Sequence, residues 1–361
     1  MRIMFCLGSM TKGGAERVVA NLANDFARQN DIAIVVTPPD ASSYELNKKI
    51  TFKTLDSFED KKKNVLLRTI RRIKKLKIII KDFNPDIIVS LLPEPSFRVM
   101  LATFFHRRKV IISVRNDPKV EYNNTLKKLL VKILYERADG FIFQTVDAQK
   151  FFSNKVQEKS VIIPNPIADE FIGKPFNGPR NNHIVTVGRL TSQKNHVLLI
   201  NAFSEVVQRY PSYELHIYGD GELKEELIKL SQKLNLANKI FFEGNVDNIK
   251  NYIYKAKMFV LSSDYEGMPN ALMEAMALGI PSISTDCPCG GSAFLMKNKE
   301  NGILVPVNNL ASLKDAMIKI IEDEDYAKKI SLNANKIGSK LNTKIINKQW
   351  IDYITKILKE K

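Results

Sequence analysis

The chain has 361 residues, 44% of them hydrophobic and 26% charged, and this length exceeds what one hydrophobic core usually serves, so we expect two domains. No run approaches the ~18 consecutive apolar residues of a membrane-spanning helix, and the first apolar segment is predicted as a strand without a signal peptide. Cys6, Cys287 and Cys289 are too few for a disulfide framework, which indicates reduced thiols in a cytoplasmic protein.

The net charge of +16 is distributed unevenly along the chain. Residues 1–165 hold 30 Lys and Arg against 17 Asp and Glu, a balance of +13, whereas the remainder holds 25 against 22, a balance of +3. A basic first half predicts contact with something anionic: nucleic acid, a membrane surface or a phosphorylated substrate.

Short apolar runs rich in β-formers alternate with helical segments throughout the chain. This alternation is typical of doubly wound parallel sheets, so the predicted fold class is α/β. The strands predicted in the first half are 2–7, 31–37, 85–92, 109–115, 140–145 and 160–166. Those predicted in the second half are 183–188, 213–219, 239–244, 258–263, 281–285 and 302–306.

The segment 166–182 is rich in Pro, Gly and Asn and is predicted to be a linker. We therefore expect Rossmann-like domains at 1–165 and 183–344, with ligands bound at the carboxyl ends of strands facing an inter-domain cleft. In the last segment, 345–361, Trp350 and three aliphatic residues recur at helical spacing. We expect this helix to pack back toward the N-terminal domain.

Gly13 and Gly14 directly follow the first predicted strand, within TKGGAE, and open a helix. Glycines there allow close approach of a ligand to the backbone, and the helix end can receive a phosphate. The pattern is not GxGxxG, so an ordinary tight strand-to-helix turn is the alternative.

The densest basic segment is 64–83, NVLLRTIRRIKKLKIIIKDF. Its apolar residues, Leu66, Ile70, Ile73, Ile80 and Phe83, are predicted to share one helical face, and its cations cluster elsewhere: Arg68, Arg71, Arg72 and Lys75. One interpretation is a helix packed on the core with solvated charges. The other is contact with anionic lipid headgroups or a lipid-linked diphosphate.

The second half of the chain contains two motifs that could carry chemistry. GRLTSQKN places Arg189 and Lys194 in a loop after a strand, where two cations could bind a diphosphate or simply be solvated. Residues 262–285 are predicted to contain a short apolar helix that begins at Pro269. Glu266 precedes this helix, and Glu274 lies within it. Two carboxylates beside helix amides suit a sugar nucleotide, although an ion pair of Glu274 with a buried Arg or Lys is the alternative.

Together, TKGGAE, SVRND, GRLTSQKN, YGDGE, FEGNV and EGMPNALMEAMALGIPSIST resemble the retaining glycosyltransferases of family 4, which have the GT-B fold of two Rossmann-like domains. The resemblance implies that Arg189 and Lys194 hold the donor diphosphate, that Glu274 binds the ribose, and that Glu266 contacts the transferred sugar. It makes Glu266, Arg189 and Lys194 the catalytic residues. The remaining donor-binding residues that it implies are Gly13, Gly14, Val246, Gly267, Met268, Asn270 and Ala271.

One position departs from the family pattern. Many members carry His where this chain has Arg115, and Arg cannot transfer a proton at ordinary pH. Arg115, Asn116 and Asp117 are therefore candidates for the acceptor side, together with the basic segment's cations.

The resemblance implies retaining transfer of a hexose or N-acetylhexosamine from a nucleotide diphosphate sugar, UDP by family habit, to a polyprenyl-diphosphate-linked glycan. It further implies bacterial capsule, exopolysaccharide, O-antigen or glycoprotein-glycan assembly at the inner face of the cytoplasmic membrane. No metal or other cofactor is expected, since the Asp-x-Asp at Asp323 and Asp325 lies in a polar helical stretch. A nucleic-acid-binding protein, a phosphorylase and an epimerase are the alternatives, although no nucleic-acid module is evident.

Overall fold

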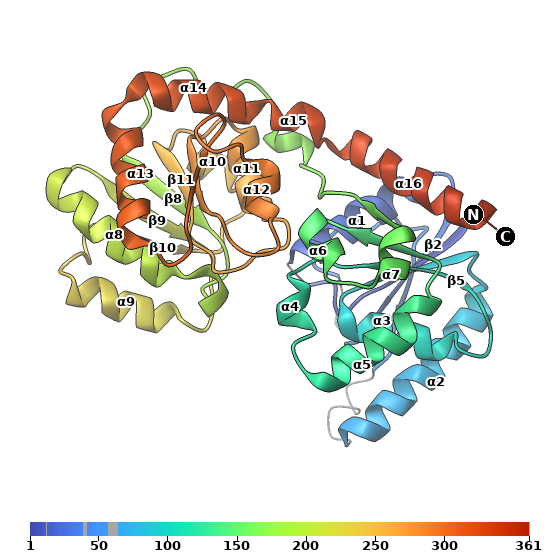
Figure 1. The fold of residues 1–361 in the computed structure, drawn as a ribbon. Coiled ribbons are helices and arrows are strands. Elements are labelled where there is room, and N and C mark those ends of the chain that lie inside the picture. The colour runs from blue at the N-terminus through green and yellow to red at the C-terminus, as the bar shows by residue number, and fades with distance from the viewer. Residues whose placement is uncertain (12, 39–41, 57–63, 361) are drawn as a thin grey trace. The chain divides into compact units, whose positions relative to one another are not determined.

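The computed structural model describes residues 1–11, 13–38, 42–56 and 64–360. The chain divides into two compact units (Figure 1). The N-terminal unit comprises Met1–Pro166 with Lys344–Lys361, and the C-terminal unit comprises Ile167–Thr343. The division falls at the first residue of the predicted linker, and the rest of that segment belongs to the C-terminal unit. No helix among the described residues is long and apolar enough to cross a membrane.

The N-terminal unit is built on a seven-stranded parallel sheet in the order β3-β2-β1-β4-β5-β6-β7. Its strands are β1 (Arg2–Cys6), β2 (Asp31–Val36), β3 (Thr51–Thr54), β4 (Ile87–Leu91), β5 (Lys109–Ser113), β6 (Gly140–Phe143) and β7 (Ser160–Ile162). Six of these match predicted strands. The sequence missed β3 because this short edge strand is half exposed and has no apolar run.

Helices cover both faces of this sheet, as Rossmann-like topology requires. They are α1 (Gly14–Phe26), α2 (Val65–Phe83), α3 (Pro93–Ala102), α4 (Pro118–Glu121), α5 (Thr125–Leu134), α6 (Val146–Lys150), α7 (Asn154–Glu158) and α16 (Thr343–Lys359). The C-terminal helix α16 packs on this unit through Trp350, which is fully buried. Its Tyr353 hydroxyl donates to the Lys159 carbonyl oxygen at 2.5 Å and accepts from the Phe141 amide at 3.0 Å.

The C-terminal unit has a six-stranded parallel sheet in the order β10-β9-β8-β11-β12-β13. Its strands are β8 (His183–Val187), β9 (Glu214–Tyr218), β10 (Ile240–Gly244), β11 (Met258–Leu261), β12 (Ser282–Thr285) and β13 (Ile303–Val305). Its helices are α8 (His196–Arg209), α9 (Lys224–Lys233), α10 (Lys250–Ile253), α11 (Asn270–Ala277), α12 (Gly291–Leu295), α13 (Leu310–Glu322), α14 (Glu324–Asn335) and α15 (Ile337–Lys340). Each predicted strand of the second half is present.

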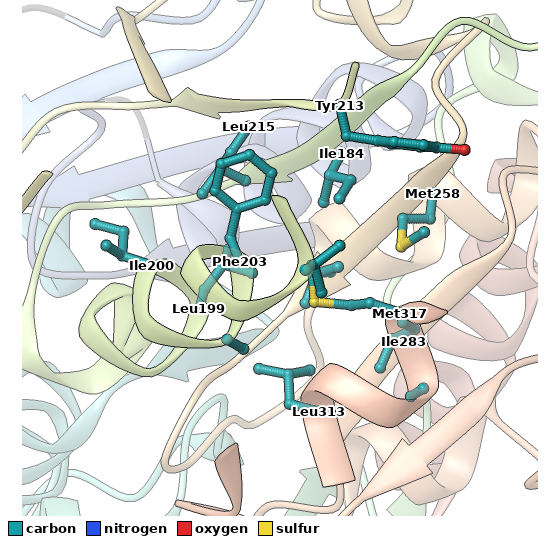
Figure 2. Packing of buried hydrophobic residues seen from close by; sticks show 14 of the residues in the cluster. Ile184, Leu199, Ile200, Phe203, Tyr213, Leu215, Met258, Ile283, Leu313 and Met317 are labelled. Atoms are coloured by element: carbon teal, nitrogen blue, oxygen red, sulfur yellow. The ribbon is translucent and has the colours of Figure 1, made fainter. Parts of the chain in front are cut away.

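The core of this unit lies between one face of the sheet and the helices α8 and α13 (Figure 2). Ile184 of β8 and Leu215 of β9 point toward Phe203 of α8 and Met317 of α13, and all four side chains are fully buried. Successive side chains of a strand alternate between faces. The neighbours of Ile184 and Leu215 therefore lie on the opposite face of the sheet, away from this core.

Candidate functional site

In the C-terminal unit, strand order reverses between β8 and β11, which pair with each other in the middle of the sheet. At such a switch point, the loops leaving the two strands diverge and open a crevice outside their carboxyl ends. The loop after β8 carries Arg189 and Lys194, and the loop after β11 carries Glu266. The topology thus brings two motifs that are distant in sequence to one edge of one sheet.

The two loops meet through an ion pair. Lys194 Nζ lies 2.5 Å from Glu266 Oε1, and the two side chains are only 15% and 8% exposed. Ser263 Oγ donates to the same carboxylate oxygen at 2.7 Å. Low exposure strengthens such contacts and fixes both side chains in place. The cation and the carboxylate are therefore fixed against each other where the two loops meet.

Further hydrogen bonds join the loop backbones. Gln193 Nε2 donates to the Tyr265 carbonyl oxygen at 2.9 Å, and the Asp264 amide donates to the Gln193 carbonyl oxygen at 2.9 Å. Asn195 is the N-cap of α8, and its Nδ2 donates to Asp264 Oδ1 at 2.7 Å. These bonds make the two loops one preorganised structure.

Arg189 is exposed at the end of β8, close in sequence to Gly188. Next to it, Gly219 has φ +134°, and a Cβ at that position would lie 2.0 Å from the Gly188 carbonyl oxygen. Only glycine fits there. The loops after β8 and β9 consequently lie against each other, with the Arg189 guanidinium left on the solvent side.

Helix α11 begins directly after the Glu266 loop, with Pro269 as its N-cap residue. Gly267 and Met268 precede the helix, and Asn270 and Ala271 form its first turn. A helix start directs backbone N–H groups and a partial positive charge outward, which favours an anion. Gly279, at φ +68°, ends the helix as predicted.

Glu274 lies inside α11 and is 6% exposed, as is Glu266. Its sequence neighbours Met273 and Ala275 are buried as well. Val246, the remaining predicted donor residue of this unit, is half buried in the turn after β10. It too lies at the carboxyl end of the sheet.

In the N-terminal unit, Gly13 is the N-cap of α1 and Gly14 its exposed first residue. The Gly13 amide donates to Tyr44 Oη at 3.0 Å, and the Tyr44 hydroxyl donates to the Gly13 carbonyl oxygen at 2.8 Å. The φ of Gly13 is −161°, an extended conformation open to any residue. Glycine is therefore not required at position 13 by the backbone itself. Lys12 of the same motif lies outside the described residues.

Arg115 is buried at the carboxyl end of β5, where it is 8% exposed. Its Nη1 donates to Asn165 Oδ1 at 2.9 Å, and its guanidinium carbon lies 4.9 Å from the centroid of the Trp350 ring. Burial lowers the pKa of Arg115 to about 9. Much of this side chain therefore packs inside the unit, with α16 forming one wall.

The two residues after Arg115 have local partners. Asp117 is 4% exposed and caps α4, since its Oδ1 accepts from the Lys119 amide at 2.9 Å. The Asn116 side chain hydrogen-bonds to Glu121, whose pKa rises to about 7 because it is buried close to Glu94. Arg115, Asn116 and Asp117 thus lie at the carboxyl end of β5. Asp117, however, serves to cap α4.

Two features of the basic helix α2 could not be read from its sequence pattern. Leu66 and Ile70 are 68% and 44% exposed, because only the later part of α2, around Leu76 and Ile80, is buried. Arg72 is not part of an exposed cluster, since it forms an ion pair with Asp56. The periodicity predicted a helix correctly. It does not show which part of α2 is covered by the rest of the unit.

Comparison with known proteins agrees with this geometry. The family described as Glycosyl transferases group 1 matches residues 168–337, and Glycosyltransferase Family 4 matches residues 12–171. An uncharacterized glycosyltransferase of Methanocaldococcus jannaschii is 30% identical over 81% of this chain and 86% of its own length.

The chain belongs to glycosyltransferase family 4.

Other relatives and solved structures agree. An alpha-1,4-N-acetyl-D-galactosaminyltransferase of Campylobacter jejuni is 24% identical to this glycosyltransferase over 99% of each chain. HepE of Anabaena, solved with UDP and glucose, superposes with a TM-score of 0.84 at 20% identity, covering 98% of this chain and 99% of HepE. The glycosyltransferase therefore has the GT-B fold, as the resemblance implied.

Sequence reasoning missed several residues that shape the glycosyltransferase's site. Ser263, Gln193 and Asp264 hold the ion-paired loops, and none of them was predicted. Ser263 and Asp264 directly follow β11, so the rule that ligands bind at the carboxyl ends of strands could have found them. Nothing in the sequence marked Gln193, because its contact depends on how β8 and β11 lie side by side.

Proposed function

We propose that this glycosyltransferase moves a hexose or N-acetylhexosamine from a nucleotide diphosphate sugar to a glycan acceptor with retention of anomeric configuration. The observation that carries the proposal is the Lys194–Glu266 ion pair beside the start of α11. A cation, a carboxylate and helix amides at one switch point match a diphosphate, a sugar hydroxyl and a phosphate oxygen.

On the donor side, Arg189 and Lys194 bind the diphosphate, helped by the amides of Gly267, Met268, Asn270 and Ala271. Lys194 has three N–H donors, so it can maintain its ion pair with Glu266 and contact a phosphate at the same time. Glu266 accepts from hydroxyls of the transferred sugar, and Glu274 accepts from the ribose. Val246 contacts the base, and Gly13 and Gly14 approach the phosphates. UDP is the proposed nucleotide, supported by the UDP-bound HepE structure.

The proposed chemistry follows from where charge develops. The bond between the anomeric carbon and the leaving phosphate oxygen breaks, and the acceptor oxygen forms the new glycosidic bond on the same face. The acceptor's proton passes to the leaving phosphate oxygen. Cations and amides that contact this oxygen interact with it more strongly in the transition state than in the ground state. No metal is then needed for the step.

For the acceptor, we propose a glycan linked to polyprenyl diphosphate in bacterial surface-glycan assembly. Two Campylobacter jejuni relatives support this, because their names describe transfer to saccharides on diphospho-undecaprenol or PP-undecaprenol. The exposed Leu66, Leu67 and Ile70 of α2, close in sequence to Arg68 and Arg71, would meet a membrane surface. The protein would then work from the cytoplasmic face, with Arg115 and Asn116 toward the acceptor.

The proposal is tested with a panel of UDP-sugars, a lipid-diphosphate-linked saccharide acceptor and EDTA in the buffer. We expect transfer with one UDP-sugar, an α-anomeric product by NMR, and no loss of rate with EDTA. Lys194→Ala should lower the rate ~10²-fold or more, as loss of one transition-state contact does. The control is Lys229→Ala, at an exposed position on α9. A product of inverted configuration, or a fully active Lys194→Ala enzyme, would contradict the proposal.

A further inference from the structure

We propose that His183, Glu214 and His216 bind one Zn²⁺-class metal ion on the sheet of the C-terminal unit, outside the sugar-transfer site. The three residues belong to adjacent strands: His183 begins β8, Glu214 begins β9, and His216 lies two residues further along β9. The register pairs His183 with Glu214 and Val185 with His216. Each offers one ligand atom, and all of these atoms lie within 4.8 Å of one another.

The distances between the ligand atoms suit a metal better than direct hydrogen bonds. Glu214 Oε2 lies 3.5 Å from His183 Nε2 and 3.4 Å from His216 Nε2. A direct N–H···O hydrogen bond usually spans about 2.7–3.2 Å. Tetrahedral Zn²⁺ with bonds of about 2.0–2.1 Å places its ligand atoms about 3.3–3.4 Å apart. The spacing of the Glu214 oxygen from each imidazole nitrogen thus matches the spacing of two ligand atoms in such a tetrahedron.

A hydrogen bond to Glu243 orients the His216 imidazole for this role. Glu243 Oε1, on β10, lies 2.7 Å from His216 Nδ1, so metal binding through Nε2 would leave Nδ1–H to donate to Glu243. Metal-binding histidines almost always have a partner of this kind on the other ring nitrogen. Phe241 stacks on the His216 ring at 4.9 Å between centroids and holds its plane.

The surroundings allow an ion to reach the cluster from solvent. The cluster lies on the sheet face opposite the core, because Ile184 and Leu215 point toward α8 and α13 (Figure 2). The side chains of His183 and Glu214 are about one-third exposed and that of His216 is 11% exposed, and we expect a water from solvent as the fourth ligand.

The position of the cluster indicates a structural metal. His183 and Glu214 begin their strands, whereas Arg189 and Lys194 follow the carboxyl end of β8. An ion there would join β8 to β9 and, through Glu243, to the edge strand β10. Bound metal should therefore stabilise the C-terminal unit while leaving sugar transfer independent of metal.

The test uses the purified full-length protein, stripped with EDTA and desalted. We expect calorimetric titration with ZnCl₂ to show one ion per chain, CoCl₂ to give the visible absorption of a four-coordinate site, and MgCl₂ to show no binding. Zn²⁺ should also raise the unfolding temperature. His183→Gln and His216→Gln should each weaken Zn²⁺ binding at least 100-fold. Glu243→Gln should weaken it 10–100-fold, because Glu243 contacts the His216 ring and not the ion.

His106→Gln provides the matched control, because His106 is an exposed histidine of the N-terminal unit. It should bind Zn²⁺ as the wild type does. Circular dichroism verifies that each variant is folded. If one of the two histidine variants does not fold, the other still tests the proposal. The proposal is overturned if Zn²⁺ does not bind saturably, or if folded His183→Gln and His216→Gln proteins bind it as the wild type does.

Discussion

Lys194 and Glu266 form a nearly buried ion pair across 72 residues of sequence. Glu266 lies in a loop and Lys194 ends a single 3₁₀ turn, Ser192–Lys194. Hydrogen bonds between the segments after β8 and β11 hold both residues. Burying a carboxylate alone is costly, and its cationic partner offsets that cost. The same two groups that stabilise the loops are those proposed to meet the diphosphate and the transferred sugar.

Replacing Lys194 with Met should therefore affect stability as well as transfer. We expect the free energy of unfolding to fall by roughly 1–3 kcal/mol, because Glu266 keeps its charge without a charged partner. Combining Lys194→Met with Glu266→Gln should restore most of that stability but none of the transfer activity. Urea unfolding and initial rates measure the two effects. Additive stability changes in the double variant would argue against coupling of the pair.

Glu274→Gln should weaken binding of UDP while hardly changing the fold. The amide keeps the size of the side chain inside α11 but is a weaker acceptor for ribose hydroxyls. Wild-type protein with UDP at ~100 times its dissociation constant should gain about 2.7 kcal/mol of stability, and the variant should lose most of that gain. Thermal unfolding with and without UDP is the measurement. Glu226→Gln, at an exposed position on α9, should keep the full gain.

Much of the fold could be predicted from local pattern, because buried parallel strands appear as apolar runs such as HIVTV and MFVLS. The prediction missed β3, whose sequence TFKT lies at the sheet edge and needs no apolar run. It left open whether Leu66 and Ile70 are covered, because periodicity shows which residues share a face but not whether anything covers that face.

The site could be predicted only as a set of separate loops. Arg189 and Glu266 were predicted as site residues because they follow the carboxyl ends of strands and because the motifs around them resemble the family. The contact of Lys194 with Glu266 depends on β8 pairing with β11, through Ile184 with Met258, and no local pattern reveals that pairing. His183 and His216 were missed for the same reason, since only the register of β8 on β9 brings them together.

Trp350→Ala should destabilise the N-terminal unit by about 3–5 kcal/mol, the usual cost of removing a fully buried aromatic side chain. The change also removes the ring beside the Arg115 guanidinium, which would leave this buried cation without its cation–π contact. Trp350→Phe keeps an aromatic face and should cost less. Urea unfolding followed by circular dichroism compares the variants, and equal stability of Trp350→Ala and wild type would contradict the role given to α16.

His196 should make the C-terminal unit sensitive to acid. This residue begins α8, is 3% exposed, and neither ring nitrogen has a hydrogen-bond partner among the described residues. Burial and the nearby Lys194 lower the pKa of His196 from 6.5 to about 4. The folded state therefore favours neutral His196, so its contribution is complete above pH 6.5 and is lost as pH falls toward 4, by at most about 1.4 kcal/mol per pH unit. His196→Leu cannot be protonated and should show a shallower loss of stability over this range, measured by urea unfolding at pH 7, 6 and 5. Equal slopes for the variant and the wild type would show that the imidazole does not control this acid sensitivity.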